Sequence, residues 1–115
     1  MAYNEHLADR IRRAFQEKRA AFEEKKMMGG LCFLVDGKMC AGIVEDKLMA
    51  RIGPAIYQAA LTKNGCTEMD FTGRPMKGYV FVQPEGIDAD ADLAEWIQLC
   101  LDFNPRAKSS RKVAK

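Results

Sequence analysis

The sequence predicts a single α+β domain in which helices pack on an antiparallel sheet. Both ends of the chain carry apolar residues at helical spacing, the middle alternates apolar runs with tight-turn signals, and β-branched and aromatic residues gather in the runs. A length of 115 residues suits one domain with one core. The expected elements are a helix at 4–20, strands at 31–35, 38–44 and 48–52, a helix at 54–61, strands at 67–71 and 78–83, and a helix at 88–103.

The two ends of the chain carry the clearest helix signals. Asn4 suits an N-cap, because its side-chain oxygen can accept a hydrogen bond from a backbone N–H of the first turn. Asp88, Asp90 and Asp92 open the last helix, where negative charge suits the helix dipole. Each helix also has an apolar stripe, so both should pack on the sheet. The stripes are Leu7, Ile11, Ala14 and Phe15 in the first helix, and Leu93, Trp96, Ile97, Cys100, Leu101 and Phe103 in the last.

The centre of the chain predicts an antiparallel meander. Asp36 and Gly37 between two apolar runs are a strong signal for a two-residue hairpin turn, which also sets the pairing of the flanking strands. The adjacent Gly29 and Gly30 indicate a bulge or a close approach of two backbones. The expected pairs are Val35 with Lys38, Leu34 with Met39, Phe33 with Cys40, and Cys32 with Ala41.

The predicted core draws on most of these elements. Pro54 suits the first turn of the middle helix, where its missing N–H costs nothing. Aromatic and β-branched residues around position 80 favour a strand. The expected core residues are Leu7, Ile11, Phe15, Phe33, Ile43, Ile52, Phe71, Phe81, Leu93, Trp96 and Ile97.

Both faces of the first two strands are apolar, which is unusual for a half-exposed antiparallel sheet. Either helices cover both faces, or one face is a subunit interface. Since the three helices can all pack on one face, the sequence favours an interface and therefore a homodimer. One face would hold Leu31, Phe33 and Val35, and the other Cys32, Leu34, Met39, Ala41 and Ile43.

Charge is distributed unevenly along the chain. Residues 106–115 hold five basic residues and no acid, whereas residues 1–105 have a net charge of −3. We therefore divide the chain into a domain at 1–105 and a basic, disordered tail at 106–115, which could also act as a weak arm for nucleic acid. The sequence has no apolar run long enough to span a membrane and no secretory signal, so a cytoplasmic location is expected.

The four cysteines do not predict a metal site. They lack the close pairs typical of structural zinc sites, and the single histidine is His6 near the N-terminus. The hairpin register places Cys32 and Cys40 on opposite faces, so these two residues can share neither a metal nor a disulfide. We expect buried thiols in a reducing compartment, no metal and no cofactor. Cys66, which follows Gly65 in a loop, is the cysteine most suited to exposure and reactivity.

The sequence predicts no enzyme. Its only serines, Ser109 and Ser110, lie in the tail, far from His6, which argues against a serine triad. Glu68 and Asp70 would share one face of a strand, but such a pair is more often a solvated face than an acid–base pair. Motifs for phosphate loops, dinucleotides and zinc proteases are missing. No catalytic residue is therefore assigned.

A small basic group is the one candidate binding surface. Arg74 and Lys77 flank Met76 in the turn-rich segment 70–78, which could be a structural connection or an anion- or protein-binding loop. Arg51, a lone arginine late in an apolar strand, is expected to pair with an acid such as Glu68 or to contact a ligand.

Four segments resemble the N-terminal domain of the TfoX/Sxy competence-regulator family, especially its short, single-domain members. They are residues 26–33 (KMMGGLCF), 36–39 (DGKM), 48–51 (LMAR) and 69–78 (MDFTGRPMKG). The resemblance extends over residues 5–103. It implies an α+β fold of the secretion-chaperone type, in the element order already predicted, and a regulatory role linked to DNA-uptake genes. It implies no catalytic residues.

Four functions remain open on this basis. The first is a non-enzymatic interaction module that acts on a regulatory protein partner or as a homodimer, and the second is a small-molecule or anion binder that uses Arg51, Arg74 and Lys77. The third is an enzyme that uses Cys66 or an unrecognised carboxylate. The fourth is direct nucleic-acid binding through the tail, against which the net charge of the body argues.

Overall fold

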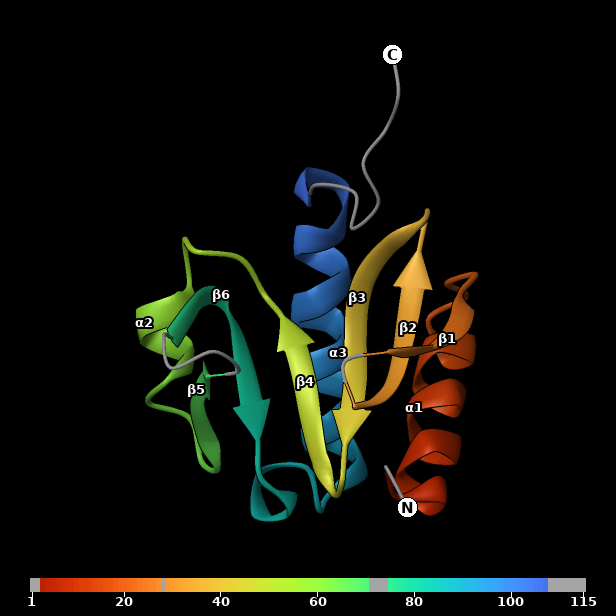
Figure 1. Cartoon of the computed structure of the whole chain (residues 1–115), viewed down its shortest axis with the longest axis horizontal. Helices are drawn as coiled ribbons and strands as arrows, with labels where there is room; N and C mark the ends of the chain where they lie inside the picture. The colour runs from red at the N-terminus through yellow and green to blue at the C-terminus, as the bar shows by residue number, and fades with distance from the viewer. Residues whose placement is uncertain (1–2, 28, 71–74, 108–115) are drawn as a thin grey trace.

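The computed structural model describes residues 3–27, 29–70 and 75–107, and it shows the predicted α+β architecture. A six-stranded antiparallel sheet, ordered β1-β2-β3-β4-β6-β5, carries helices on one face (Figure 1). None of the described helices has the length and apolar character needed to cross a membrane. The elements are α1 (Glu5–Glu17), β1 (Glu23–Met27), β2 (Gly30–Val35), β3 (Lys38–Val44), β4 (Lys47–Arg51), α2 (Tyr57–Ala60), β5 (Cys66–Asp70), β6 (Pro75–Val82), the short turn η1 (Pro84–Gly86), α3 (Asp90–Phe103) and the short turn η2 (Asn104–Arg106).

Helix α1 begins as predicted. The Asn4 side-chain oxygen accepts a hydrogen bond from the Leu7 N–H at 3.1 Å, which satisfies one of the unpaired donors at the helix start. The helix ends at Glu17, three residues before the predicted end, and Arg19 then turns the chain with a φ of 58°.

Strand β1 was not predicted, because its sequence EEKKM has no apolar alternation. It pairs antiparallel with β2 at the edge of the sheet. Arg12 of α1 reaches across to the carboxylate of Glu24, with Nη2 2.9 Å from Oε1. The hydrogen bond and charge of Glu24 raise the pKa of Arg12 above its usual value. Charged side chains on an edge strand discourage pairing with another chain, so this composition suits the position.

The predicted hairpin is present, but its register is only half right. Asp36 and Gly37 both have positive φ, 57° and 75°, as the tight turn requires, and the first two expected pairs are confirmed. Beyond them a bulge shifts the register, so that Phe33 pairs with Ala41 and Cys32 with Gly42. Cys40 is the extra residue of the bulge.

The bulge also corrects the assignment of side chains to the two faces. Cys40 and Ala41 both pack into the main core, and Ile43 follows them, although strict alternation had placed Ala41 and Ile43 on the opposite face. Met39 stays on the opposite face as expected. Cys32 and Cys40 do lie on opposite faces, which confirms that prediction.

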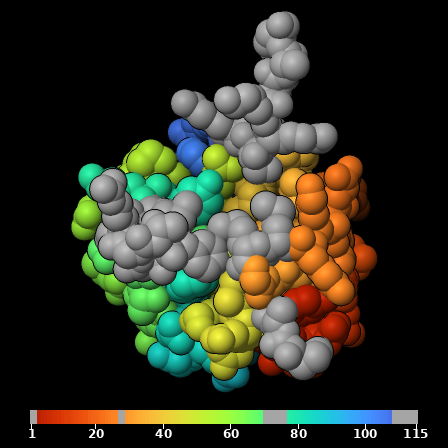
Figure 2. Space-filling model, in the orientation of Figure 1, coloured from red at the N-terminus to blue at the C-terminus, as the bar shows by residue number. Residues whose placement is uncertain are grey.

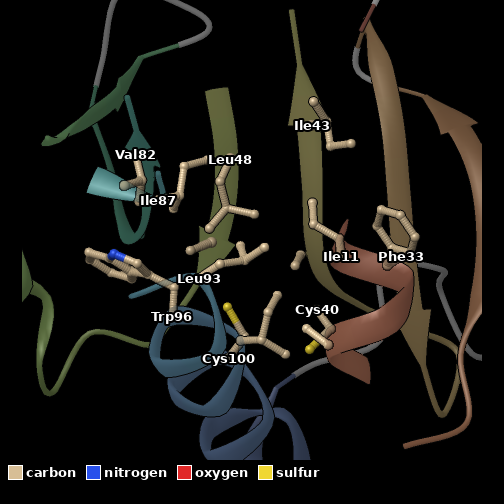
Figure 3. Close-up of a cluster of buried hydrophobic side chains, with 14 of the residues drawn as sticks. Ile11, Phe33, Cys40, Ile43, Leu48, Val82, Ile87, Leu93, Trp96 and Cys100 are labelled. Carbon is tan, nitrogen blue, oxygen red and sulfur yellow. The ribbon is translucent and has the colours of Figure 1, made fainter. Parts of the chain in front are cut away.

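The main core lies between the sheet and the helices (Figure 3). Ile11 of α1 and Trp96 and Cys100 of α3 point toward the side chains of the strands. Phe81 is only partly buried and faces the other side of the sheet, so its assignment to this core was wrong, and Phe71 lies outside the described residues. The other nine expected core residues are buried here: Leu7, Ile11, Phe15, Phe33, Ile43, Ile52, Leu93, Trp96 and Ile97.

A second, smaller cluster lies on the sheet face opposite the helices, the face turned to the viewer in Figures 1 and 2. Its members come only from strands, and each exposes 9% or less of its surface. The apolar residues that indicated a subunit interface are therefore already buried within one chain. The homodimer stays a prediction. The buried members are Cys32, Leu34, Met39, Met49 and Met69.

The middle of the chain differs from expectation mainly in helix length. Residues 54–56 form a turn, and α2 covers only Tyr57–Ala60. Strand β6 begins at Pro75, three residues early, and the Gly78 carbonyl accepts hydrogen bonds from the N–H groups of Ile52 and Gly53 at 2.9 and 3.0 Å. These bonds tie the exit of β4 to β6 at the place where a pocket opens.

Candidate functional site

A pocket of about 330 Å³ opens where the end of β4, the start of β6 and the end of α3 meet. Three of its lining residues are basic and two are aromatic. Because its charged residues are all basic, we call it the cationic pocket. Its lining residues are Arg51, Gly53, Pro54, Lys77, Gly78, Tyr79, Phe103 and Arg106.

Two glycines bring the walls of the cationic pocket together. Gly53 and Gly78 have φ of 88° and 93°, a region in which a side chain is strained. A Cβ on Gly53 would lie 2.4 Å from the Cδ1 atom of Phe103, so the ring rests directly on the glycine backbone. A Cβ on Gly78 would lie 3.2 Å from the carbonyl carbon of Gly53. The close contact of Phe103 with the β4 exit therefore depends on glycine.

Arg51 is held in place from three sides. Its guanidinium carbon lies 5.2 Å from the ring centroid of Tyr79 and 5.9 Å from that of Phe103. Its Nη1 donates a hydrogen bond to the Met39 carbonyl at 3.3 Å. The register explains the first contact, because Arg51 pairs with Tyr79 across β4 and β6. Cation–π contacts of this kind orient a guanidinium without neutralising it.

The expected ion pair between Arg51 and Glu68 is not formed. Glu68 pairs with Val80, whose side chain points into the main core, whereas Arg51 shares the opposite face with Tyr79. The two side chains therefore lie on opposite sides of the sheet. Glu68 instead lies near Tyr57 of α2, where burial and then the charge of Glu68 raise the pKa of the Tyr57 hydroxyl.

Sequence reasoning missed Arg106, which it placed in the disordered tail. Turn η2 continues α3 past Pro105, so Arg106 lies one turn after Phe103 and its guanidinium carbon is 5.7 Å from that ring centroid. The signal in the sequence was that Arg106 follows Phe103 by three residues, a spacing that places two side chains on the same side of a helix. Within the described residues, neither Arg51, Lys77 nor Arg106 forms an ion pair with a carboxylate.

The structure brings two of the four predicted binding residues together. Arg51 and Lys77 line the same pocket, and the Lys77 side chain is exposed. Arg74 lies outside the described residues, and of Met76 only the backbone, within β6, is described. A carboxylate or phosphate is the natural ligand for such a group, because a guanidinium can donate two parallel hydrogen bonds to either.

The cysteine thiols whose pKa is shifted, those of Cys32, Cys66 and Cys100, all have a raised pKa. Burial raises the pKa of the half-buried Cys66 thiol to about 11, whereas a nucleophilic cysteine needs a lowered pKa. The Cys100 thiol is fully buried beside Cys40, and their hydrogen bond raises the pKa of Cys100 well above its usual value. Among the described residues, no group of His, Cys, Asp and Glu side chains could hold a metal ion.

One protein-family profile matches most of the chain. The sequence profile of the TfoX N-terminal domain matches residues 13–104, which include every strand, helix α3 and most of the cationic pocket. No curated protein and no solved structure matches this chain significantly. Because the profile covers most of the chain, the protein belongs to the TfoX N-terminal domain family.

Proposed function

We propose that this domain is a non-enzymatic regulatory module that acts by binding, and that the cationic pocket receives an anionic group of its ligand. The observation that carries the proposal is the state of Arg51. Its guanidinium is held between two rings and a carbonyl, lines an open pocket together with Lys77 and Arg106, and has no carboxylate partner among the described residues.

The physical case rests on preorganisation and charge. A long cationic side chain loses conformational entropy when a ligand immobilises it, and Arg51 has already lost much of that freedom. Three cations lining one pocket repel one another, so an anion between them removes repulsion as well as forming new bonds. The pocket volume lies within the range of small-ligand sites.

The regulatory part of the proposal rests on family membership. The chain belongs to the TfoX N-terminal domain family, and the resemblance described above links that family to the control of DNA-uptake genes. We therefore propose that the bound anion belongs to, or controls contact with, a regulatory protein partner. The reduced thiols of Cys40, Cys66 and Cys100 suit a reducing compartment such as the bacterial cytoplasm.

The test is a titration of the full chain with inorganic phosphate and with acetate in a chloride-free buffer, followed by the arginine Nε–Hε resonances. We expect the Arg51 resonance to shift with saturation, and the variant Arg51→Met to bind about tenfold more weakly or worse, since it removes a charge-assisted hydrogen bond. Arg13→Met is the matched control, because Arg13 is exposed on α1, lies outside the pocket and carries the same charge.

Two results would contradict the proposal. One is a saturable shift that Arg13→Met weakens as much as Arg51→Met, which would indicate unspecific attraction by net charge. The other is no saturation by either anion at millimolar concentration. Urea denaturation of both variants tests whether they remain folded, so that a loss of binding can be told apart from a loss of folding.

A further inference from the structure

A second pocket of about 440 Å³ lies directly beside the cationic pocket. Most of its lining is aliphatic or aromatic, so we call it the apolar pocket. It shares Pro54, Phe103 and Arg106 with the cationic pocket, so these three residues form the wall between the two. Its lining residues are Ile52, Pro54, Ala55, Ile56, Leu99, Asp102, Phe103 and Arg106.

The two pockets differ in the charged residues that line them. Arg51 and Lys77 line only the cationic pocket, whereas Asp102 lines only the apolar pocket. Asp102 is exposed and accepts a hydrogen bond from Gln98 at 2.8 Å, and it forms no ion pair with a described cation. Arg106 lines both pockets, so the apolar pocket has one charge of each sign, whereas the cationic pocket has three positive charges. An anion is therefore favoured in the cationic pocket.

The shared wall suits a ligand that occupies both pockets at once. Two guanidinium groups, of Arg51 and Arg106, lie within 6 Å of the Phe103 ring centroid, at 5.9 and 5.7 Å. The half-buried side chains of Ile56 and Leu99 offer apolar surface on the other side of the wall. A ligand with a charged head directly next to an apolar body would match this arrangement.

We propose that the two pockets form one site for an amphipathic acid, with its carboxylate against Arg51 and Lys77 and its aliphatic or aromatic body in the apolar pocket. This inference rests on the proposed function, and it adds the class of ligand. Each CH₂ group transferred from water into the apolar pocket should tighten binding about three- to fourfold. The carboxylate source is a free organic acid or the C-terminal residue of a peptide, which share this chemistry.

The experiment compares acetate, butanoate, hexanoate and octanoate with inorganic phosphate and 1-hexanol, by calorimetric and resonance titration of the full chain. We expect affinity to rise about three- to fourfold per CH₂ until the apolar pocket is filled. We expect 1-hexanol to bind far more weakly than hexanoate, because it lacks the charge that Arg51 and Lys77 recognise.

The outcomes separate this inference from the proposed function. If acetate and phosphate bind as tightly as octanoate, the apolar pocket takes no part, and the inference fails while anion binding stands. If 1-hexanol binds as tightly as hexanoate, the carboxylate does not contribute and the inference also fails. If no anion binds, both the inference and the proposed function fail.

Two variants assign the apolar body to its pocket. Ala55→Trp fills the apolar pocket from an exposed position, and Leu99→Gln makes its wall polar. Both should reduce octanoate affinity to nearly that of acetate and leave phosphate affinity unchanged. Ala59→Trp, at an exposed position of α2 that lines neither pocket, is the matched control and should change nothing.

A peptide arm identifies the source of the carboxylate. A tetrapeptide that ends in leucine is titrated with its C-terminus free and with its C-terminus amidated. If the free form binds more tightly than the simple acids and the amide does not bind, the ligand is a protein C-terminus. If octanoate binds and neither peptide does, the ligand is a free acid. If the amide binds as tightly as the free peptide, the carboxylate is not recognised and the inference is overturned.

Discussion

The substitution Gly30→Ala should destabilise the fold strongly, although it adds a single methyl group. A Cβ at this position would lie 1.8 Å from the carbonyl oxygen of Ile43 and 3.2 Å from the Cα of Val44. A relaxed contact between carbon and a carbonyl oxygen is about 3.3 Å or longer, so strands β2 and β3 would have to separate by roughly 1.5 Å at this point. Both atoms belong to the backbone of a central strand and cannot move aside alone.

Two costs add up to the expected magnitude. Overpacking a well-filled site costs about 1–3 kcal/mol, and each weakened ladder hydrogen bond costs about 1 kcal/mol. We therefore expect the free energy of unfolding to fall by about 3 kcal/mol. Gly29→Ala is the neighbouring control, because its Cβ would meet nothing within 4 Å and only its φ of 78° is unfavourable. That variant should lose about 1–2 kcal/mol.

Urea denaturation gives both values. Trp96 is the only tryptophan and is 3% exposed, so its fluorescence reports unfolding of the core. A Gly30→Ala variant that is no less stable than Gly29→Ala would refute the close approach of β2 and β3.

Two further predictions concern burial. Trp96→Ala should lower the free energy of unfolding by about 3–5 kcal/mol, whereas Phe81→Ala should lower it by about 1–2 kcal/mol because the Phe81 ring is only partly buried. Both values are measured by urea denaturation followed by circular dichroism. Equal losses would contradict the assignment of Trp96 to the main core and Phe81 to the opposite face of the sheet. Cys66 should alkylate slowly at pH 8, where roughly a thousandth of it is thiolate, and its rate should rise about tenfold per pH unit until pH 11. The alkylation rate of Cys66 is measured with iodoacetamide and mass spectrometry. A rate that levels off below pH 9 would show that burial does not raise the pKa of this thiol.

Local signals predicted the elements that local chemistry determines. Asp36 and Gly37 both adopt positive φ because few other residues do so at low cost, and Asn4 caps α1 through its own side chain. Gly29 and Gly30 indicated a bulge or a close approach of backbones, and the close approach is present at Gly30. Each of these features depends on a residue type that is chemically suited to one conformation.

Other features depend on contacts between distant segments, and these were missed. Strand β1 has no apolar pattern, and it forms because β2 offers an edge and Arg12 holds Glu24. The bulge at Cys40 has no glycine or proline at the bulged residue or at its immediate neighbours Met39 and Ala41, so no residue type marks it locally. A single added residue there moved Ala41 and Ile43 to the opposite face from the one predicted.

The candidate site shows the same division between local and distant causes. Arg51 and Lys77 were recognised as unusual charges near an apolar strand and a turn, and the pairing of β4 with β6 brings them together. The expected ion pair between Arg51 and Glu68 does not form, because the two side chains point to opposite faces of the sheet. Arg106 was missed because asparagine and proline after Phe103 indicate a helix end, whereas the chain adds one further turn.

The bulge and the site are linked through Arg51. The ladder between β3 and β4 pairs Ala41 with Ala50 and does not continue to Met39, whose carbonyl instead accepts a hydrogen bond from Arg51. On the other face the bulged Cys40 packs against Cys100 of α3, the helix that also supplies Phe103 to the pocket. The position of the guanidinium therefore depends on the same bulge that seats α3. A substitution that removes the bulge should change ligand affinity even though it touches neither pocket.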